Sequence, residues 1–420
     1  MQRFRKLGLF LLFLAGAIVV TLFIMNRPGR AIRAAADLEY PELTDSENAA
    51  FLYRAAWREL EATPGGVDRA TLSRYHKSIL ARIGFAEELE EALSESDLGA
   101  VAQLLTEAEP VFEILRQVRS TKGCLFLQDH SPEAINENLT EFIETGTLMR
   151  SLARHVAARA LWEAEQGNTD AALDWLTTGL HLANDLSDES VLIGELVRIA
   201  IGIHMLSAAQ GILYNRPLPE PIPQALLHEL DDLRDRSHYG DSLRREGAFS
   251  EALMHAQSQG VWWFSLRPMW QGSYLEALDT FIEAVEENDH TERSRRIDEL
   301  SSRVAMSSVG SMSYFHIYES MLLPALMRSE ESLETLIAKT DLLELGLSLR
   351  AYEQTHGAFP DTLAELTPEY LAAIPEDPLN GKDYIYEKSD ERVTVRSGEM
   401  IQRREIAFHL APNARDTDSR

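Results

Sequence analysis

The chain has 420 residues, which is long enough for two or three domains that each bury a hydrophobic core. Hydrophobic residues make up 45% and charged residues 25%, the usage of an ordinary globular protein, so the composition argues against a wholly disordered chain. The net charge is −27, and an acidic surface is repelled by phosphate backbones, so nucleic acid is not expected as a partner. The single cysteine, Cys124, excludes an internal disulfide and a cysteine-based zinc site.

Residues 7–25 form the first predicted element, a run of 19 residues without a charge. At 1.5 Å per residue such a helix is about 28 Å long, close to the thickness of a membrane's hydrocarbon core. A cleaved signal peptide is the alternative, but its apolar region usually has about 7 to 15 residues and small residues soon after it. We therefore predict an uncleaved membrane-spanning helix that includes Leu7, Phe10, Leu14, Ile18, Leu22 and Met25.

Residues 1–36 are a membrane anchor with basic flanks. Three basic residues precede the apolar run and three follow it, so the charge bias that orients membrane helices is nearly balanced; it favours a cytoplasmic N-terminus and an exported body. The remaining chain carries 34 basic against 67 acidic side chains, a difference of −33.

Residues 37–216 are predicted to form a helical domain. Thr44 precedes Glu47 by three residues, a capping-box pattern that marks a helix start. Apolar residues recur at helical spacing over residues 152–186 and are interrupted at Gly167, which predicts a hairpin of two helices. This hairpin resembles one tetratricopeptide unit in its small residues, although no second copy follows at a 34-residue period. The small residues are Ala160, Ala172 and Gly179.

Residues 191–213 are apolar on most faces but include Glu195, Arg198 and His204. A second membrane span would place these groups in lipid at about 2.5 to 3.5 kcal/mol for a central charge, so we predict a buried core helix instead. Glu195 and Arg198 are three residues apart and are expected to pair on one face of that helix.

Residues 217–223 contain four alternating prolines and form a predicted proline-rich connector. A second helical region, residues 224–335, follows. It is interrupted near a cluster of aromatic residues, which we interpret as core packing rather than a ligand platform or a membrane-facing rim. The cluster consists of Trp262, Trp263, Phe264 and Trp270.

In residues 336–420 the long helical pattern gives way to a helix followed by short strand-like runs. This pattern predicts a small α+β module. A helix is expected to end at Gly357, and three short strands are expected at residues 384–387, 392–396 and 405–409, the first two forming a hairpin. The predicted fold class is therefore mostly α, with an N-terminal transmembrane helix, a body of helical hairpins that is tetratricopeptide-like in part, and this C-terminal α+β module.

A motif within this module carries a resemblance to a known family. Residues 349–360 read LRAYEQTHGAFP, and the sequences IPEDPLNG, YIY and SG follow in that order. The pattern resembles the C-terminal half of the major pseudopilins of type II secretion systems, and its residues have turn roles. The whole chain resembles membrane-anchored helical proteins of planctomycete-like bacteria. The motif residues are Tyr352, Gly357, Pro360, Pro375, Asp377, Pro378, Gly381, Tyr386 and Gly398.

The resemblance implies a single-pass protein of the bacterial inner membrane with its body in the periplasm. Two features of pseudopilins are missing. The glutamate of their N-terminal processing motif is not found after Gly8, and the residues after Gly398 do not form a calcium loop rich in Asp and Gly. A cleaved, fibre-forming subunit is therefore not expected, and no calcium ligands are carried over.

Spacings that catalysis requires are not found: the sequence has no phosphate loop, no GxGxxG after a strand, no HExxH helix and no GxSxG elbow. Weaker acid and histidine pairings occur at Glu141 and Glu144, at Asp235 and His238, and at Glu251 and His255, and these are more cheaply explained as surface pairs.

The sequence therefore predicts a membrane-anchored interaction or scaffold protein with a protein partner in the envelope, without cofactor or metal. The alternatives are an exported enzyme whose acids and histidines meet only in the folded chain, and a component associated with a type II secretion-like assembly.

Overall fold

The computed structural model describes residues 40–63, 68–84, 93–127, 134, 138–189, 192–257, 267–307, 317–401 and 404–412. The membrane segment predicted at residues 7–25 and the aromatic residues Trp262, Trp263 and Phe264 lie outside these, as does the side chain of Trp270. The chain divides into two compact units. Among the described residues, the larger unit comprises those of Tyr40–Gln128, Leu139–His238 and Glu331–Arg420, and the smaller comprises those of Tyr239–Glu330 together with Ala134 and Asn138.

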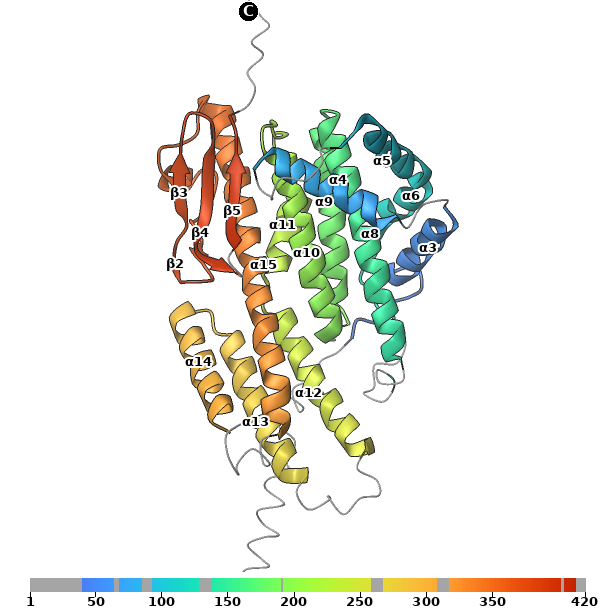
Figure 1. Cartoon of the computed structure of the whole chain (residues 1–420), viewed down its shortest axis with the longest axis vertical. Coiled ribbons are helices and arrows are strands. Elements are labelled where there is room, and N and C mark those ends of the chain that lie inside the picture. The colour runs from blue at the N-terminus through green and yellow to red at the C-terminus, as the bar shows by residue number, and fades with distance from the viewer. Residues whose placement is uncertain are drawn as a thin grey trace, which may run out of the picture. The chain divides into compact units, whose positions relative to one another are not determined.

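The described chain is mostly helical and ends in a small sheet module, as predicted. Figure 1 labels its elements. The helices of the larger unit are α3 (Ala49–Ala62), α4 (Arg69–Arg82), α5 (Glu95–Glu107), α6 (Glu109–Val118), α8 (Leu139–Glu165), α9 (Thr169–Asn184), the short 3-10 helix η1 (Asp185–Ser187), α10 (Leu192–Leu213) and α11 (Gln224–Arg234). Most of α12 (Ser237–Gln257) and all of α13 (Arg267–Val285) and α14 (His290–Ser307) belong to the smaller unit, and α15 (Ile317–His356) crosses the division between the units.

Polar caps set the starts of several helices. The side chain of Asp68 accepts hydrogen bonds from two backbone N–H groups in the first turn of α4, and Ser94 and Asp97 form a capping box on α5. The predicted start of the first helix is wrong by about one turn. Thr44 and Glu47 do bond to each other, but they close a turn, and Asn48 is the residue that caps α3.

The predicted hairpin of two helices consists of α8 and α9 (Figure 1). Gly167 lies between them with φ = +83°, a conformation that glycine adopts without steric cost. Close packing explains Gly179 on α9, since a side chain there would collide with Met205 of α10 and crowd Val156 of α8. The three helices α8, α9 and α10 each pack against the other two and form a three-helix bundle in the larger unit.

The apolar helix α10 lies among α4, α8 and α9. It is long and apolar enough to cross a membrane, the one such helix in the described chain, and 61% of its most apolar window is buried in the structure. Glu195 and Arg198 are fully buried and make two hydrogen bonds of 2.8 Å to each other, as predicted from their spacing. Pairing offsets part of the cost of burying the two charges.

The C-terminal module contains a three-stranded antiparallel sheet of order β3-β4-β5, formed by β3 (Ile385–Lys388), β4 (Val393–Ile401) and β5 (Arg404–Leu410). All three strands lie where the sequence predicts strands, and the first two form the predicted hairpin. The sequence analysis missed a pair of two-residue strands, β1 (Glu376–Asp377) and β2 (Lys382–Asp383). The preceding helix α15 ends at His356, directly before Gly357, as predicted.

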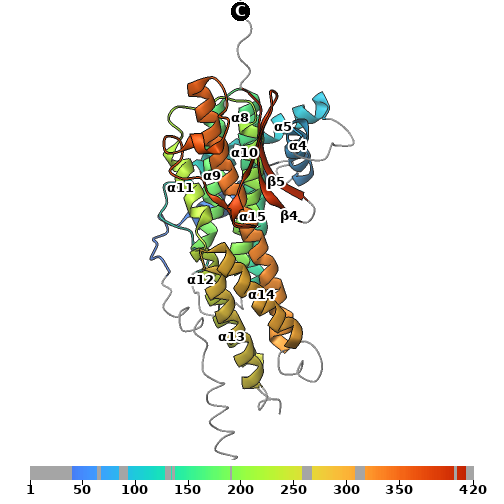
Figure 2. The same cartoon turned by 90° about the vertical axis from the view of Figure 1, so that its left-hand side faces the viewer.

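The sheet packs on the helices of the larger unit, beside α15 and α10 (Figure 2). The buried guanidinium of Arg350 on α15 donates hydrogen bonds to the carbonyl oxygens of Leu213, Tyr214 and Ala411. The side chain of Gln210 on α10 bonds to both the N–H and the carbonyl oxygen of His409 in β5. Parts of the predicted domains 37–216 and 336–420 thus belong to the same compact unit. The boundaries of the predicted domains stay a prediction.

Candidate functional site

The IPEDPLNG motif of the C-terminal module centres on Asp377, which is fully buried. One carboxylate oxygen accepts a hydrogen bond from Leu379 N, and the other accepts bonds from Asn380 Nδ2, Ser397 Oγ and Gly398 N. These contacts join the turn between β1 and β2 to strand β4. Asp377 therefore holds the loop in shape, and its oxygens are already occupied by donors from the protein.

The other motif residues also have structural roles. Tyr352 stacks on His356 with ring centroids 4.1 Å apart, and the Tyr386 hydroxyl donates to Pro360 O at 2.8 Å. Gly357 and Gly381 have φ values of +79° and +64°, which favour glycine. Pro375 and Pro378 flank strand β1, and Pro378 is buried. The motif builds the module rather than a cluster of reactive groups.

A second cluster, the acid–histidine cluster, lies at the end of α9. It consists of Tyr53, His181, Asp185, Asp188 and Glu229. Tyr53 donates to Asp185 at 2.6 Å, while His181 Nδ1 lies 2.9 Å from Glu229 Oε1 and His181 Nε2 lies 3.5 Å from Asp185 Oδ1. Asp188 accepts a hydrogen bond of 2.6 Å from the backbone N–H of Cys124, which ties a loop to the helix.

Burial dominates the protonation of the acid–histidine cluster. It raises the pKa of Asp185 to about 7 against the opposing effects of His181 and Tyr53, and it raises the pKa of Asp188 to about 6. Burial alone would lower the pKa of His181, but its hydrogen bond to Glu229 and the charges of Asp185 and Glu229 raise the pKa to about 9. His181 is therefore an imidazolium at neutral pH, held by its acidic neighbours.

Shifted pKa values are common at catalytic sites, but a catalytic group must also reach a substrate. Asp185 is 7% exposed and Glu229 8% exposed, and their oxygens bond to groups of the protein itself. The acid–histidine cluster therefore connects α3, α9 and α11 and stabilises the larger unit. The sequence analysis did not single it out, although His181 and Asp185 are four residues apart and lie on one helical face.

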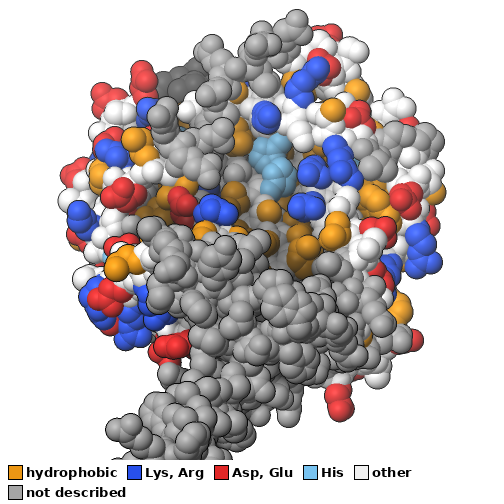
Figure 3. All heavy atoms as spheres, turned by 60° about the horizontal axis from the view of Figure 1, so that its bottom comes forward, with side chains coloured by type: hydrophobic (Ala, Val, Ile, Leu, Met, Phe, Trp, Pro, Cys, Tyr) orange, Lys and Arg blue, Asp and Glu red, His pale blue; other side chains and the backbone are white. Residues whose placement is uncertain are grey.

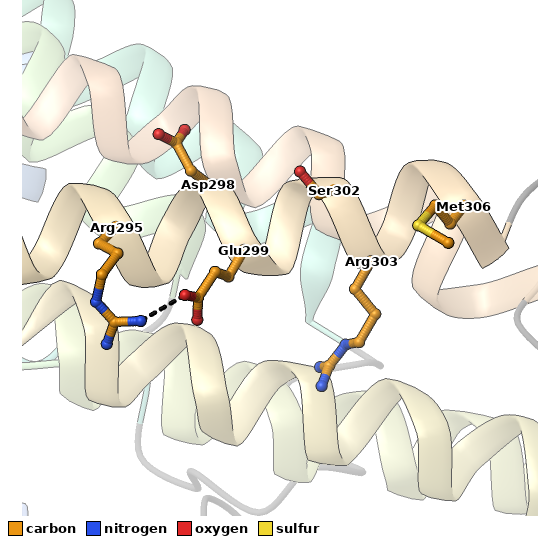
Figure 4. Close-up of a pocket in the computed structure, with 6 residues that line it drawn as sticks. All are labelled: Arg295, Asp298, Glu299, Ser302, Arg303 and Met306. Atoms are coloured by element: carbon orange, nitrogen blue, oxygen red, sulfur yellow. Dashed lines mark hydrogen bonds and ion pairs between the residues drawn. The ribbon is translucent and has the colours of Figure 1, made fainter.

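A surface hollow follows one face of α14 in the smaller unit (Figure 4). The described residues that line it all come from that helix, and two of them, Arg295 and Glu299, form an ion pair one turn apart on it. A hollow lined by a single helix is an open groove with no second wall to enclose a ligand. Its lining residues are Arg295, Asp298, Glu299, Ser302, Arg303 and Met306.

The weak acid and histidine pairings, which the sequence analysis interprets as surface pairs, have other partners in the structure. His238 bonds to Asp232 at 3.1 Å, while Asp235 accepts from Ser237 N. Glu141 forms an ion pair with Arg54, and the side chains of Glu251 and His255 lie outside the described residues. Within the described chain, no group of three or more His, Cys, Asp or Glu side chains is arranged to hold a metal ion.

Comparison of the chain with protein-family models, with curated proteins and with solved structures finds no match of any of the three kinds.

Proposed function

We propose that this protein is a membrane-tethered interaction protein of the bacterial envelope, anchored in the inner membrane by one N-terminal helix with its body in the periplasm. In this proposal the body acts as a scaffold and binds a protein partner, and it carries out no reaction that needs a cofactor or metal. The tetratricopeptide-like hairpin α8–α9 and the pseudopilin-like module are the two parts of the body that would contribute binding surfaces.

The observation that carries the proposal is the uncharged 19-residue run at residues 7–25, followed in the same chain by a folded helical body. An apolar run of that length is stable in lipid, whereas the body carries many more acidic than basic side chains and belongs in water. A chain with these two parts is suited to holding a folded body close to a membrane surface.

The buried polar groups support a scaffold more than an enzyme. Asp185, Glu229 and Asp377 have low exposure and accept hydrogen bonds from neighbouring side chains or backbone groups. An exported enzyme would need such groups in a cleft that a substrate can enter. The hollow on α14 does not contain any of these three residues.

In this proposal the C-terminal sheet binds through its exposed face. On the outer edge of β5, the side chain of Gln210 bonds to both the N–H and the carbonyl oxygen of His409, which protects that part of the edge from strand pairing. The side chains of Lys388 and Tyr386 in β3 bond to the carbonyl oxygens of Phe359 and Pro360. Apolar side chains nevertheless reach the surface of this sheet, where Ile385 is 36% exposed and Met400 67% exposed.

Membrane attachment is tested with the variant Leu14→Arg/Ile18→Arg, which places two charges in the apolar run. Each central arginine opposes insertion by about 2.5 to 3.5 kcal/mol, so the variant is expected in the soluble fraction after an alkaline carbonate wash, while the wild-type chain stays with the membranes. Leu14→Ala/Ile18→Ala is the matched control and should stay membrane-bound. A wild-type chain that washes free would contradict the anchor.

The interaction is tested by affinity capture from detergent-solubilised native membranes, with the anchor (residues 1–36) fused to an unrelated soluble domain as the control. A partner that is enriched with the full chain over that control, and that cross-links to it in intact cells, is the expected result. Capture of the same proteins by both baits would count against the body as a binding surface. Digestion of the body by protease added to spheroplasts would locate it in the periplasm, and protection there would contradict the proposed sidedness.

A further inference from the structure

Five basic or titratable side chains gather where three helices of the larger unit meet. Arg69 and His76 lie on α4, Arg150 and Arg154 lie on α8, and His204 lies on α10. We call these five residues the basic site. The spacing of seven residues on α4 and of four on α8 places each pair on one face of its helix. The helices α4, α8 and α10 pack against one another in pairs, which brings these faces together.

The histidines form the inner part of the basic site. The rings of His76 and His204 lie with their centroids 4.5 Å apart and their planes at 41°. His76 is 5% exposed, and its Nδ1 atom is buried without a hydrogen-bond partner in the described chain. Arg154 is half-buried, while Arg69 and Arg150 are exposed. Going outward, the site thus changes from the buried ring of His76, through the half-buried His204 and Arg154, to the exposed guanidinium groups of Arg69 and Arg150.

The three arginines of the basic site have no acidic partner. Most arginines in the described chain pair with a carboxylate, such as Arg82 with Glu165. Within that part of the chain, Arg69, Arg150 and Arg154 make neither a hydrogen bond nor an ion pair, and the Nη1 atom of Arg154 is buried with its hydrogen-bonding capacity unused. The net charge of the chain is −27, so acidic partners are abundant, and three clustered arginines without one are unusual in it.

The groups of the basic site affect one another's protonation. Burial and the positive charges of Arg69 and Arg150 lower the pKa of Arg154, which shows that the three guanidinium groups lie close enough to repel. Burial and the charge of Arg154 lower the pKa of His204 to about 4, and burial together with His204 lowers the pKa of His76 to about 3. At neutral pH the site therefore holds three cations and two neutral imidazoles, each of which has one N–H to donate.

Figure 3 shows a face of the molecule on which histidine side chains lie among Lys and Arg side chains, with apolar side chains between them. Such a surface contrasts with the overall acidity of the chain. Repulsion between like charges and the unused hydrogen bonds of Arg154 both oppose this arrangement in the unliganded protein. An anion bound at the site would remove both costs.

We propose that the basic site binds the phosphate group of a ligand, with Arg154 as the central contact, Arg69 and Arg150 at the rim, and the histidines as neutral N–H donors. Arginine suits this ligand because its planar guanidinium can donate two parallel hydrogen bonds to phosphate oxygens. A metal cation would be repelled by the arginines, and a long polyanion such as nucleic acid would be repelled by the net negative charge of the chain. Free phosphate, a small phosphate ester or a phospholipid headgroup could each supply the same group.

The test uses the full chain in a nonionic detergent and phosphate-free buffer, titrated with inorganic phosphate by isothermal calorimetry. The wild-type protein is expected to bind with a single saturable site. Arg154→Gln should weaken this binding at least about tenfold, since a charge-assisted hydrogen bond is lost. Arg58→Gln is the matched control. Arg58 is exposed on α3, bonds only to the carbonyl oxygen of Arg54 in the described chain, and should leave phosphate affinity within about twofold of wild type.

A misfolded variant would be recognised from its melting temperature without phosphate. Because Arg154→Gln removes a repelled and unpaired charge, it should melt at or above the wild-type temperature, yet show no rise in melting temperature when phosphate is added. If Arg154→Gln melts lower, Arg150→Gln replaces it, because Arg150 is exposed and its loss cannot disturb the core. Equal phosphate binding by wild type, Arg154→Gln and Arg150→Gln would overturn the proposal.

A second titration with soluble dihexanoyl phosphatidylglycerol separates the two sources of phosphate. Binding of inorganic phosphate with no competition from the lipid indicates a free phosphate or phosphate ester, and tighter binding of the lipid that Arg154→Gln abolishes indicates a headgroup. Either result supports the site, and the failure of both ligands to bind the wild-type protein overturns it. These outcomes are independent of membrane anchoring and of any protein partner.

Discussion

At the scale of single residues, the main feature is the number of buried charges that α10 and its neighbours hold. Glu195 and Arg198 are both fully buried, and the Nη1 atom of Arg198 has no hydrogen-bond partner in the described chain. Removing one member of a buried ion pair leaves an uncompensated charge, whereas replacing both with apolar residues can be neutral. The pair is therefore costly to break but does not by itself explain the stability of the fold.

We predict that Glu195→Leu lowers the free energy of unfolding by about 3 to 5 kcal/mol, because Arg198 would stay buried without its partner. The double variant Glu195→Leu/Arg198→Met should recover most of that loss. Urea unfolding of the full chain in nonionic detergent, followed by circular dichroism, measures both variants. A double variant less stable than the single one would show that Arg198 has another important contact.

Sequence reasoning reached some of these residues and missed others. The pairing of Glu195 with Arg198 follows from their spacing on one helix, which is a local signal. The basic site depends on contacts between α4, α8 and α10, which lie far apart in the sequence. The local signal for it was weak: Arg150 and Arg154 occupy one face of α8 with no acid three or four residues away to pair with them.

At the scale of elements, close contacts at glycine decide how the sheet packs on α15. An added Cβ atom at Gly346 would lie 2.5 Å from a ring carbon of Phe408 in β5, closer than real contacts allow. At Gly99 on α5 no atom lies within 4 Å of the added Cβ. Both glycines lower the helix propensity equally, but a side chain at Gly346 would collide with β5, whereas a side chain at Gly99 would meet open space.

We predict opposite effects of alanine at the two positions. Gly346→Ala should lower the free energy of unfolding by at least about 1 kcal/mol, because overpacking against Phe408 exceeds the gain in helix propensity. Gly99→Ala should raise it by about 0.5 to 1 kcal/mol. Urea unfolding of both variants provides the measurement. Equal stabilisation at both positions would mean that β5 can move away from α15 at little cost.

The elements that the sequence predicted well are those with strong local patterns. The end of α15 at His356 and the three strands β3, β4 and β5 follow from a glycine stop signal and from runs of strand-forming residues. The strands β1 and β2 have two residues each, too few to show any periodicity. The start of α3 was misplaced because Thr44 and Glu47 make a capping-type contact within a turn before the helix.

At the scale of the whole molecule, buried histidines link stability to pH. The folded protein keeps His76 neutral down to a pKa of about 3, while in the unfolded chain histidine takes up a proton near pH 6.5. Between these values the unfolded state binds more protons, so this stabilising contribution falls as the pH falls. His181 behaves in the opposite way, because its pKa in the folded protein is raised to about 9 and its contribution is lost as the pH rises through that value.

We predict that the two histidines give opposite pH profiles when each is replaced. The stability difference between wild type and His76→Asn should shrink on acidification from pH 6.5 to 4.5, by at most about 1.4 kcal/mol per pH unit. The difference between wild type and His181→Gln should be largest below pH 6.5 and should shrink towards pH 9.5. Each variant is the control for the other. If the stability of both variants relative to wild type changed with pH in the same direction, His76 would not be neutral and His181 would not be protonated in the folded protein.

The sequence predicted the mostly helical class and the C-terminal sheet module, since both depend on local patterns summed over long segments. It did not show that the sheet and the first helices share one compact unit. That arrangement depends on single contacts across the chain, such as those of Arg350 with Tyr214 and Ala411, and an arginine has no pattern that identifies distant carbonyl partners.

The bonds between Gln210 and His409 have a consequence for the order in which the protein forms. Strand β5 is synthesised after every helix that it contacts, and its backbone supplies the partners that the buried amide of Gln210 requires. Until this late segment emerges from the ribosome, the buried amide of Gln210 lacks both of its backbone partners. The last strand to be synthesised therefore satisfies a polar group in the middle of the most apolar helix, so removal of the C-terminal residues would leave an unpaired amide inside the helical core.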